Sequence, residues 1–173
     1  MLKTRTHGFT IVELLIIIVV ISILAAITIV AYNGIQNRAS ESAVQSDIAA
    51  LRKKFELFKV DSISGNYPST STEFNQAIDM KLTKSAYDQT QNNIYYFNNL
   101  ITGNYAIGLR AKSGKGYIVT NNGINEGVTI NANAVAIATG ASAWSDGNKF
   151  SLQGYSVSGG VGTWSTIWYM VKD

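Results

Sequence analysis

Cysteine is absent from the 173-residue chain, and histidine and proline occur once each, as His7 and Pro68. Without cysteine, disulfide bonds and thiolate metal sites are excluded. His7 is the one histidine that could act as a catalytic base. Neither a pair of acidic residues nor a glycine-rich phosphate loop stands out in the sequence. We therefore expect a protein that is not an enzyme and that holds no metal and no cofactor.

Strong charge of either sign is also lacking. The formal net charge is +3, and two of the 14 basic residues, Lys3 and Arg5, lie in the first eight positions. The remainder is close to neutral, so no electrostatic case for binding nucleic acid exists. The basic cluster at residues 52–54 is interpreted as a solvated helix face.

A long apolar run is the most prominent feature of the sequence. Residues 9–32 contain one charged residue, Glu13, and no proline. About 20 apolar residues span a bilayer, whereas the apolar core of a cleaved signal peptide usually has 7–15. Because Lys3 and Arg5 precede the run, the positive-inside rule places the N-terminus in the cytoplasm. The run predicts a single-pass membrane helix.

Glu13 is expensive in such a run, because an acid at the centre of a membrane helix costs roughly 2.5–3.5 kcal/mol on insertion scales. Two explanations are open: the side chain reaches water at the interface, or it pairs with a positive charge. An acid inside a membrane segment is by default a hypothesis for a functional site.

An amphipathic pattern follows over residues 33–60. Its apolar stripe recurs at spacings of four and three residues, as Val44, Ile48, Leu51, Phe55 and Phe58. Asp47 and Glu56 are among the polar residues predicted on the other faces. Because no proline interrupts the run, we expect one helix over residues 9–59. The stripe is predicted to face a sheet, with packing between subunits as the alternative.

Residues 61–173 are predicted to form a globular domain of loops and an antiparallel β-sheet. A short helix is expected near residues 71–80 and strands at residues 93–98, 104–111, 116–121, 149–157 and 163–171. The segment "KSGKG" suits a hairpin, and residues 121–127 suit a turn better than a calcium site. Residues 128–140 fit either a strand or a short helix. The predicted fold class is α+β.

The residues Gly8-Phe9-Thr10-Ile11-Val12-Glu13, between a short basic leader and the apolar run, resemble the N-terminus of a type IV pilin. The resemblance implies the pilin fold, in which a long N-terminal helix packs on an antiparallel sheet. It also implies that prepilin peptidase removes residues 1–8 by cutting between Gly8 and Phe9, and that Phe9 is then N-methylated. Glu13 would pair with the Phe9 amine of a neighbouring subunit.

The same resemblance implies a structural subunit with residues 9–32 in a filament core. The chain would be stored in the inner membrane, then polymerised with itself by an assembly ATPase and platform proteins into an extracellular filament. We expect the major pilin of a type IV pilus serving adhesion, twitching motility or DNA uptake. The alternatives are a minor pilin or a type II secretion pseudopilin and, from another class, a monomeric membrane-anchored binding protein.

Two features depart from the family pattern. Many pilins have a proline before the Ala-Tyr pair at residues 31–32, and many close a C-terminal loop with a disulfide. Here Ser22 and Gly34 are the places where the apolar helix would loosen. We expect residues 163–171 to be fixed by pairing into the sheet instead, with Trp164 and Trp168 packed on one face.

Overall fold

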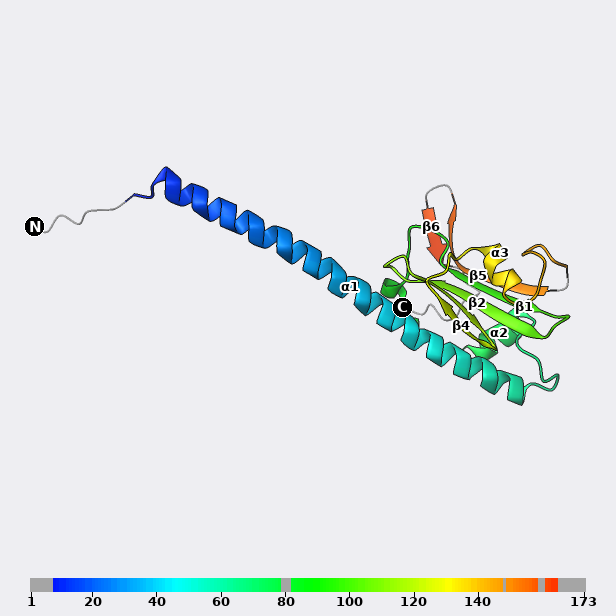
Figure 1. Ribbon diagram of the computed structural model, residues 1–173. Helices are drawn as coiled ribbons and strands as arrows, with labels where there is room; N and C mark the ends of the chain where they lie inside the picture. The colour runs from blue at the N-terminus through cyan, green and yellow to red at the C-terminus, as the bar shows by residue number, and fades with distance from the viewer. Residues whose placement is uncertain (1–7, 79–81, 148, 159–160, 165–173) are drawn as a thin grey trace, which may run out of the picture. The chain divides into compact units, whose positions relative to one another are not determined.

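The computed structural model describes residues 8–78, 82–147, 149–158 and 161–164. Contacts divide the chain into two units, Met1–Gln36 and Asn37–Asp173, and each is described by itself. The helices are α1 (Ile11–Asp61), α2 (Ser71–Ala77), the 3-10 helix η1 (Lys84–Ala86) and α3 (Ala132–Ile137). The strands are β1 (Ile94–Asn99), β2 (Asn104–Arg110), β3 (Gly116–Thr120), β4 (Gly123–Glu126), β5 (Lys149–Ser158) and β6 (Val161–Trp164) (Figure 1). The predicted α+β class is confirmed.

Helix α1 has the expected length of 51 residues, but it begins and ends two residues later than predicted. It starts at Ile11 because the side chain of Thr10 bonds to the first turn, as described below. No break occurs at Ser22 or Gly34, the two positions where loosening was considered.

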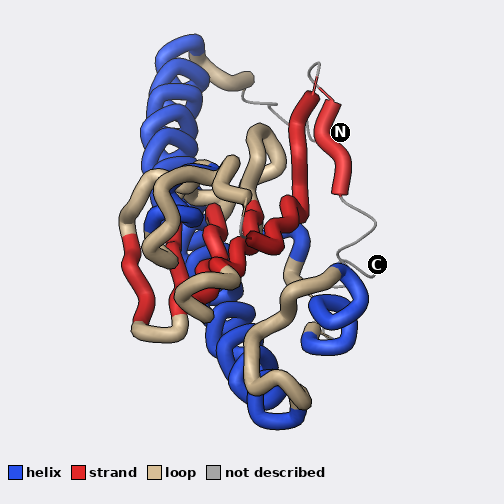
Figure 2. The backbone as a smooth tube through the Cα atoms, turned by 90° about the vertical axis from the view of Figure 1, so that its right-hand side faces the viewer, coloured by secondary structure: helices blue, strands red, loops and turns tan. Residues whose placement is uncertain are grey.

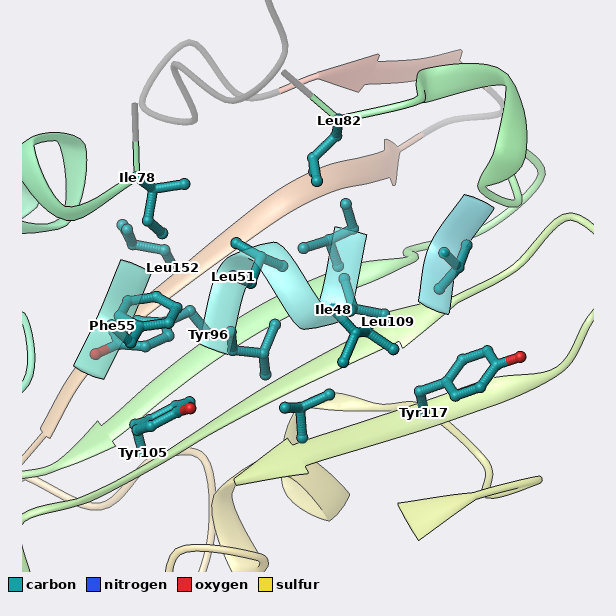
Figure 3. Packing of buried hydrophobic residues seen from close by; sticks show 14 of the residues in the cluster. Ile48, Leu51, Phe55, Ile78, Leu82, Tyr96, Tyr105, Leu109, Tyr117 and Leu152 are labelled. Carbon is teal, nitrogen blue, oxygen red and sulfur yellow. The ribbon is translucent and has the colours of Figure 1, made fainter. Parts of the chain in front are cut away.

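The predicted stripe on α1 packs into the core of the second unit. Val44, Leu51 and Phe55 are fully buried, Ile48 is 2% exposed, and Phe58 packs partly buried against the same cluster. The Phe55 ring lies 5.3 Å from the ring of Tyr96 and 5.0 Å from that of Tyr105 (Figure 3). Aromatic pairs at such separations add to the free energy of burial. The prediction that the stripe faces the sheet is confirmed.

The placement of Asp47 on a polar face was wrong. Its side chain is only 7% exposed, and its carboxylate accepts hydrogen bonds from the Tyr87 hydroxyl at 2.8 Å and the Thr83 backbone N–H at 3.2 Å. Burial raises the pKa of Asp47, although both hydrogen bonds act in the opposite direction. Asp47 therefore attaches the segment around η1 to α1.

We predict that Asp47 makes the fold less stable as pH rises. The folded pKa lies above the ordinary value of 3.8, so the folded chain holds more protons between these two values. Stability should fall as pH rises from about 4 through the raised pKa. The Asp47→Asn variant keeps an acceptor oxygen and should lose this dependence, whereas Asp47→Leu leaves two donors unpaired and should cost about 1–3 kcal/mol for each.

Thermal unfolding of the full chain in detergent, followed from pH 4 to 7, measures this effect. Identical pH profiles for the wild type and the Asp47→Asn variant would contradict it.

The described strands form one antiparallel sheet in the order β4-β3-β2-β1-β5-β6. Figure 2 shows the strands in red beside the blue second half of α1. The predicted strands up to residue 157 and the hairpin at "KSGKG" are confirmed. Strand β4 was not predicted. It follows the turn at Asn121 and Asn122, and its Glu126 pairs with Lys115 at 2.8 Å.

A second layer covers the opposite face of the sheet, where α3 lies in the segment whose structure the sequence left open. Val135 and Ala136 of α3 pack with Tyr95, Phe97 and Ala106. Gly108 allows this close approach, because a Cβ there would collide with the Val135 side chain. In Figure 1 the green strands β1 and β2 lie between the cyan part of α1 and the yellow α3. The central strands are therefore buried on both faces.

The predicted pairing of the C-terminal segment is confirmed as far as the description extends. Strand β6 pairs with β5, with Trp164 opposite Tyr155. Trp168 and the rest of the predicted strand beyond residue 164 lie outside the described residues.

Candidate functional site

The predicted cleavage site lies in exposed chain immediately ahead of α1. Gly8, Phe9 and Thr10 have no helical structure, and Phe9 is 81% exposed. Proteases act on backbone that is accessible and not bound in a helix, and Gly8 adds no side chain. The peptide bond between Gly8 and Phe9 is therefore presented in a form that an enzyme can reach.

Thr10 and Glu13 form a reciprocal capping box at the start of α1. The Thr10 hydroxyl accepts a hydrogen bond from the Glu13 backbone N–H at 3.2 Å. The Glu13 carboxylate accepts from both the backbone N–H and the hydroxyl of Thr10, each at 2.8 Å. These bonds satisfy two backbone donors that the first helical turn leaves without partners. The helix start is thus fixed two residues beyond the predicted cut.

The capping box gives Glu13 a partner within its own chain. The two explanations from sequence were contact with water and pairing with a cation, and neither includes this arrangement. Thr10 had no role in the prediction, although Thr-x-x-Glu before an apolar run is itself a capping signature. The carboxylate of an isolated subunit therefore has two hydrogen-bond donors before any neighbouring chain arrives.

The apolar helix that follows offers no unsatisfied polar side chain among its described residues before Tyr32. Ser22 and Thr28 donate to the carbonyls of Ile18 and Leu24, each at 2.7 Å. Such bonds to the preceding turn are the usual way in which hydroxyls are accommodated where no water is present.

This stretch is also uncovered. Every described residue from Gly8 to Ala39 is exposed. By length and composition, α1 is the one described helix able to cross a membrane, and it lies near the N-terminus. The apolar surface is consistent with membrane anchoring.

Several site predictions concern processing by an enzyme or contact with a second subunit, which the structure of one chain does not contain. Cleavage between Gly8 and Phe9, methylation of Phe9, and pairing of Glu13 with another subunit stay predictions. Lys3 and Arg5, which set the expected orientation, lie outside the described residues. Within the described part of the chain, no group of three or more His, Cys, Asp or Glu residues lies close enough to hold a metal ion.

Comparison with known proteins gives matches to one family model and to several curated relatives. The family described as "Prokaryotic N-terminal methylation motif" matches residues 3–29. Type II secretion system core protein G of Aeromonas hydrophila is 34% identical over 70 residues, which cover 40% of this chain and 48% of that protein. The corresponding protein of Escherichia coli K12 is 31% identical over 67 residues, covering 39% of this chain and 45% of that protein.

The chain thus spans less than half of the length of these curated relatives. No solved structure is significantly similar to it. The residues matched by the methylation motif include Gly8, Phe9 and Glu13. Together with the long N-terminal helix packed on an antiparallel sheet, these similarities show that the chain resembles type IV pilin-like proteins.

Proposed function

We propose that this chain is a structural subunit of a membrane-assembled helical filament of the pseudopilin kind. The observation that carries the proposal is the N-terminal site: an accessible Gly8–Phe9 bond, the Thr10–Glu13 capping box, and an exposed apolar helix behind them. Residues 1–8 are the leader, residues 9–32 the membrane anchor and filament core, residues 33–60 the amphipathic continuation, and residues 61–173 the globular domain.

The similarity to type II secretion core proteins favours a pseudopilin over the major pilin that we expected from sequence. The residues that led to that expectation, Phe9 and Glu13, belong to the N-terminal region that both kinds of subunit share. No observation made on this chain specifically favours a role in adhesion, motility or DNA uptake. As a structural subunit, the protein needs no catalytic site.

In the proposed filament, the apolar helices leave lipid and pack against one another. Cleavage creates an ammonium group on Phe9, and Glu13 of a neighbouring subunit pairs with it. A charged pair in an apolar bundle is tolerated when both partners also make hydrogen bonds, as Glu13 already does with Thr10. Prepilin peptidase, an assembly ATPase and a platform protein are the partners that this scheme requires.

Cell fractionation and mass spectrometry of the N-terminus test the proposal in the native host. The mature chain should begin at methylated Phe9 and stay with the cell envelope. Deletion of the gene should block release of an exoprotein while surface pili persist. Sheared surface filaments made chiefly of this chain would support the major pilin instead. An uncut N-terminus in the envelope would support the monomeric binding protein and contradict both filament roles.

A further inference from the structure

Most charged side chains in the last three turns of α1 have partners within the chain. The Tyr67 hydroxyl donates to Glu56 at 2.9 Å, and the Lys59 ammonium lies 4.6 Å from the centre of the Tyr67 ring. The positive charge of Arg52 acts on the Tyr105 hydroxyl, where burial raises the pKa and this charge opposes the rise, and Lys54 also has an interaction.

Lys53 and Asp61 differ from these charged neighbours. Both are exposed, and neither has a hydrogen bond or ion pair with any described residue. Two unpaired charges of opposite sign therefore remain, eight residues apart on one helix.

Exposed apolar side chains lie between and beside these two charges. Leu57 and Val60 follow Lys53 at spacings of four and three residues, which places all three on one helix face. Both apolar side chains are exposed, and Ile63 is exposed just beyond the helix end. Beside them is a cleft of about 520 Å³, lined by Phe58, Asp61, Ser62, Ile63, Ser64, Glu73 and Gln76. We call the face formed by Lys53, Leu57, Val60 and Asp61 the distal face.

The proposed function restricts how two copies can place their distal faces together. All subunits stored in one membrane with the same orientation have parallel helices. A parallel contact in which one copy is displaced along the helix axis is heterologous, with different residues meeting from the two copies, and it repeats into an open helical array. An antiparallel contact would close at a dimer. Lys53 of one copy meets Asp61 of the next if the copies are displaced by eight residues, or about 12 Å along the helix.

We propose that the distal face is a contact between successive copies of this chain, in which Lys53 of one copy pairs with Asp61 of the next. The same displacement brings Leu57 of the first copy about 6 Å beyond Asp61 of the second, at the helix end where Ile63 helps to line the cleft. This inference rests on the proposed filament function, and it adds a register for the second unit of the chain.

Cysteine cross-linking tests the pairing of Lys53 with Asp61. It uses the full chain in membranes from which filaments assemble. Since the sequence has no cysteine, every cross-link reports only on introduced residues. The double variant Lys53→Cys/Asp61→Cys should form a ladder of disulfide-linked oligomers, because facing positions come within disulfide reach. Neither single variant should form it. The control Lys53→Cys/Lys112→Cys, in which the second position is exposed on the β2–β3 connection, should also give none.

Charge exchange tests the same contact without a covalent bond. Lys53→Asp and Asp61→Lys each place like charges opposite each other and should reduce filament yield roughly tenfold. The double variant Lys53→Asp/Asp61→Lys restores opposite charges and should recover most of the yield.

Three outcomes would overturn the proposal in distinguishable ways. Filaments that assemble normally from the Lys53→Cys/Asp61→Cys variant but give no ladder contradict the distal contact alone. Efficient formation of disulfide-linked dimers by a Leu57→Cys variant indicates the antiparallel contact, because the proposed displacement keeps the two Leu57 positions about 12 Å apart. A wild-type chain that is neither cleaved after Gly8 nor polymerised contradicts the proposed function together with this contact.

Discussion

The Glu13→Gln variant is expected to be cleaved between Gly8 and Phe9 as the wild type is, but to be excluded from filaments. Glutamine completes a capping box with Thr10 as glutamate does, so the helix start should not move. Its neutral amide cannot pair with the ammonium group of a neighbouring Phe9. Removing one partner of a buried ion pair costs about 3–5 kcal/mol, which corresponds to a loss of more than about 100-fold in incorporation.

The ratio of filament-bound to membrane-stored chain measures incorporation into filaments. The mass of the N-terminus shows whether the chain has been cleaved. Thr10→Val is the matched variant, because it removes the capping hydroxyl and keeps the charge. It should be incorporated with a much smaller loss than Glu13→Gln. Normal filaments from Glu13→Gln would show that the charge of this residue is not needed, and would remove the proposed pairing with Phe9.

Phe55→Ala is expected to destabilise the second unit by about 3–5 kcal/mol, the usual cost of truncating a buried phenylalanine. Phe55 is fully buried, and its ring packs against Phe74, Tyr96 and Tyr105 at centroid distances of 5.9, 5.3 and 5.0 Å. The truncation leaves a cavity where the helix meets the sheet. Denaturant unfolding of the full chain in detergent, followed by tyrosine and tryptophan fluorescence, measures the loss.

Leu57→Ala is the matched control for Phe55→Ala. Leu57 lies two residues further along the same helix and is 53% exposed. Its truncation in the detergent-solubilised monomer should change the free energy of unfolding by no more than about 0.5 kcal/mol. Equal effects of the two variants would mean that the stripe on α1 does not anchor the sheet.

Periodic sequence patterns predicted the main elements correctly because the packing that they reflect is extensive. The stripe at Val44, Ile48 and Leu51 extends over several turns, and its burial follows from spacing alone. The alternation in β2 was equally informative. Tyr105, Ile107 and Leu109 face the α1 core, while Ala106 contacts the second layer. Long helices and strands whose apolar residues recur with a regular period and pack on one side can be predicted in this way.

The features missed from sequence depend on contacts between distant or short segments. The partners of Asp47 lie 36 and 40 residues further along the chain, so a local pattern shows only an acid on an amphipathic helix. Helix α3 has six residues and β4 has four, which is too short for a periodic signal. The capping box is different, because its signature is local and complete at Thr10 and Glu13.

Both hydrogen bonds from Thr10 reach one oxygen of the Glu13 carboxylate, Oε2, so in the proposed filament the amine of a neighbouring subunit can approach the other oxygen without displacing Thr10. The capping bonds are then present both in the membrane and in the filament, and they offset part of the cost of holding the carboxylate away from water in either state. A subunit that leaves the filament returns to the membrane with its carboxylate hydrogen-bonded, so the same molecule can be withdrawn and used again.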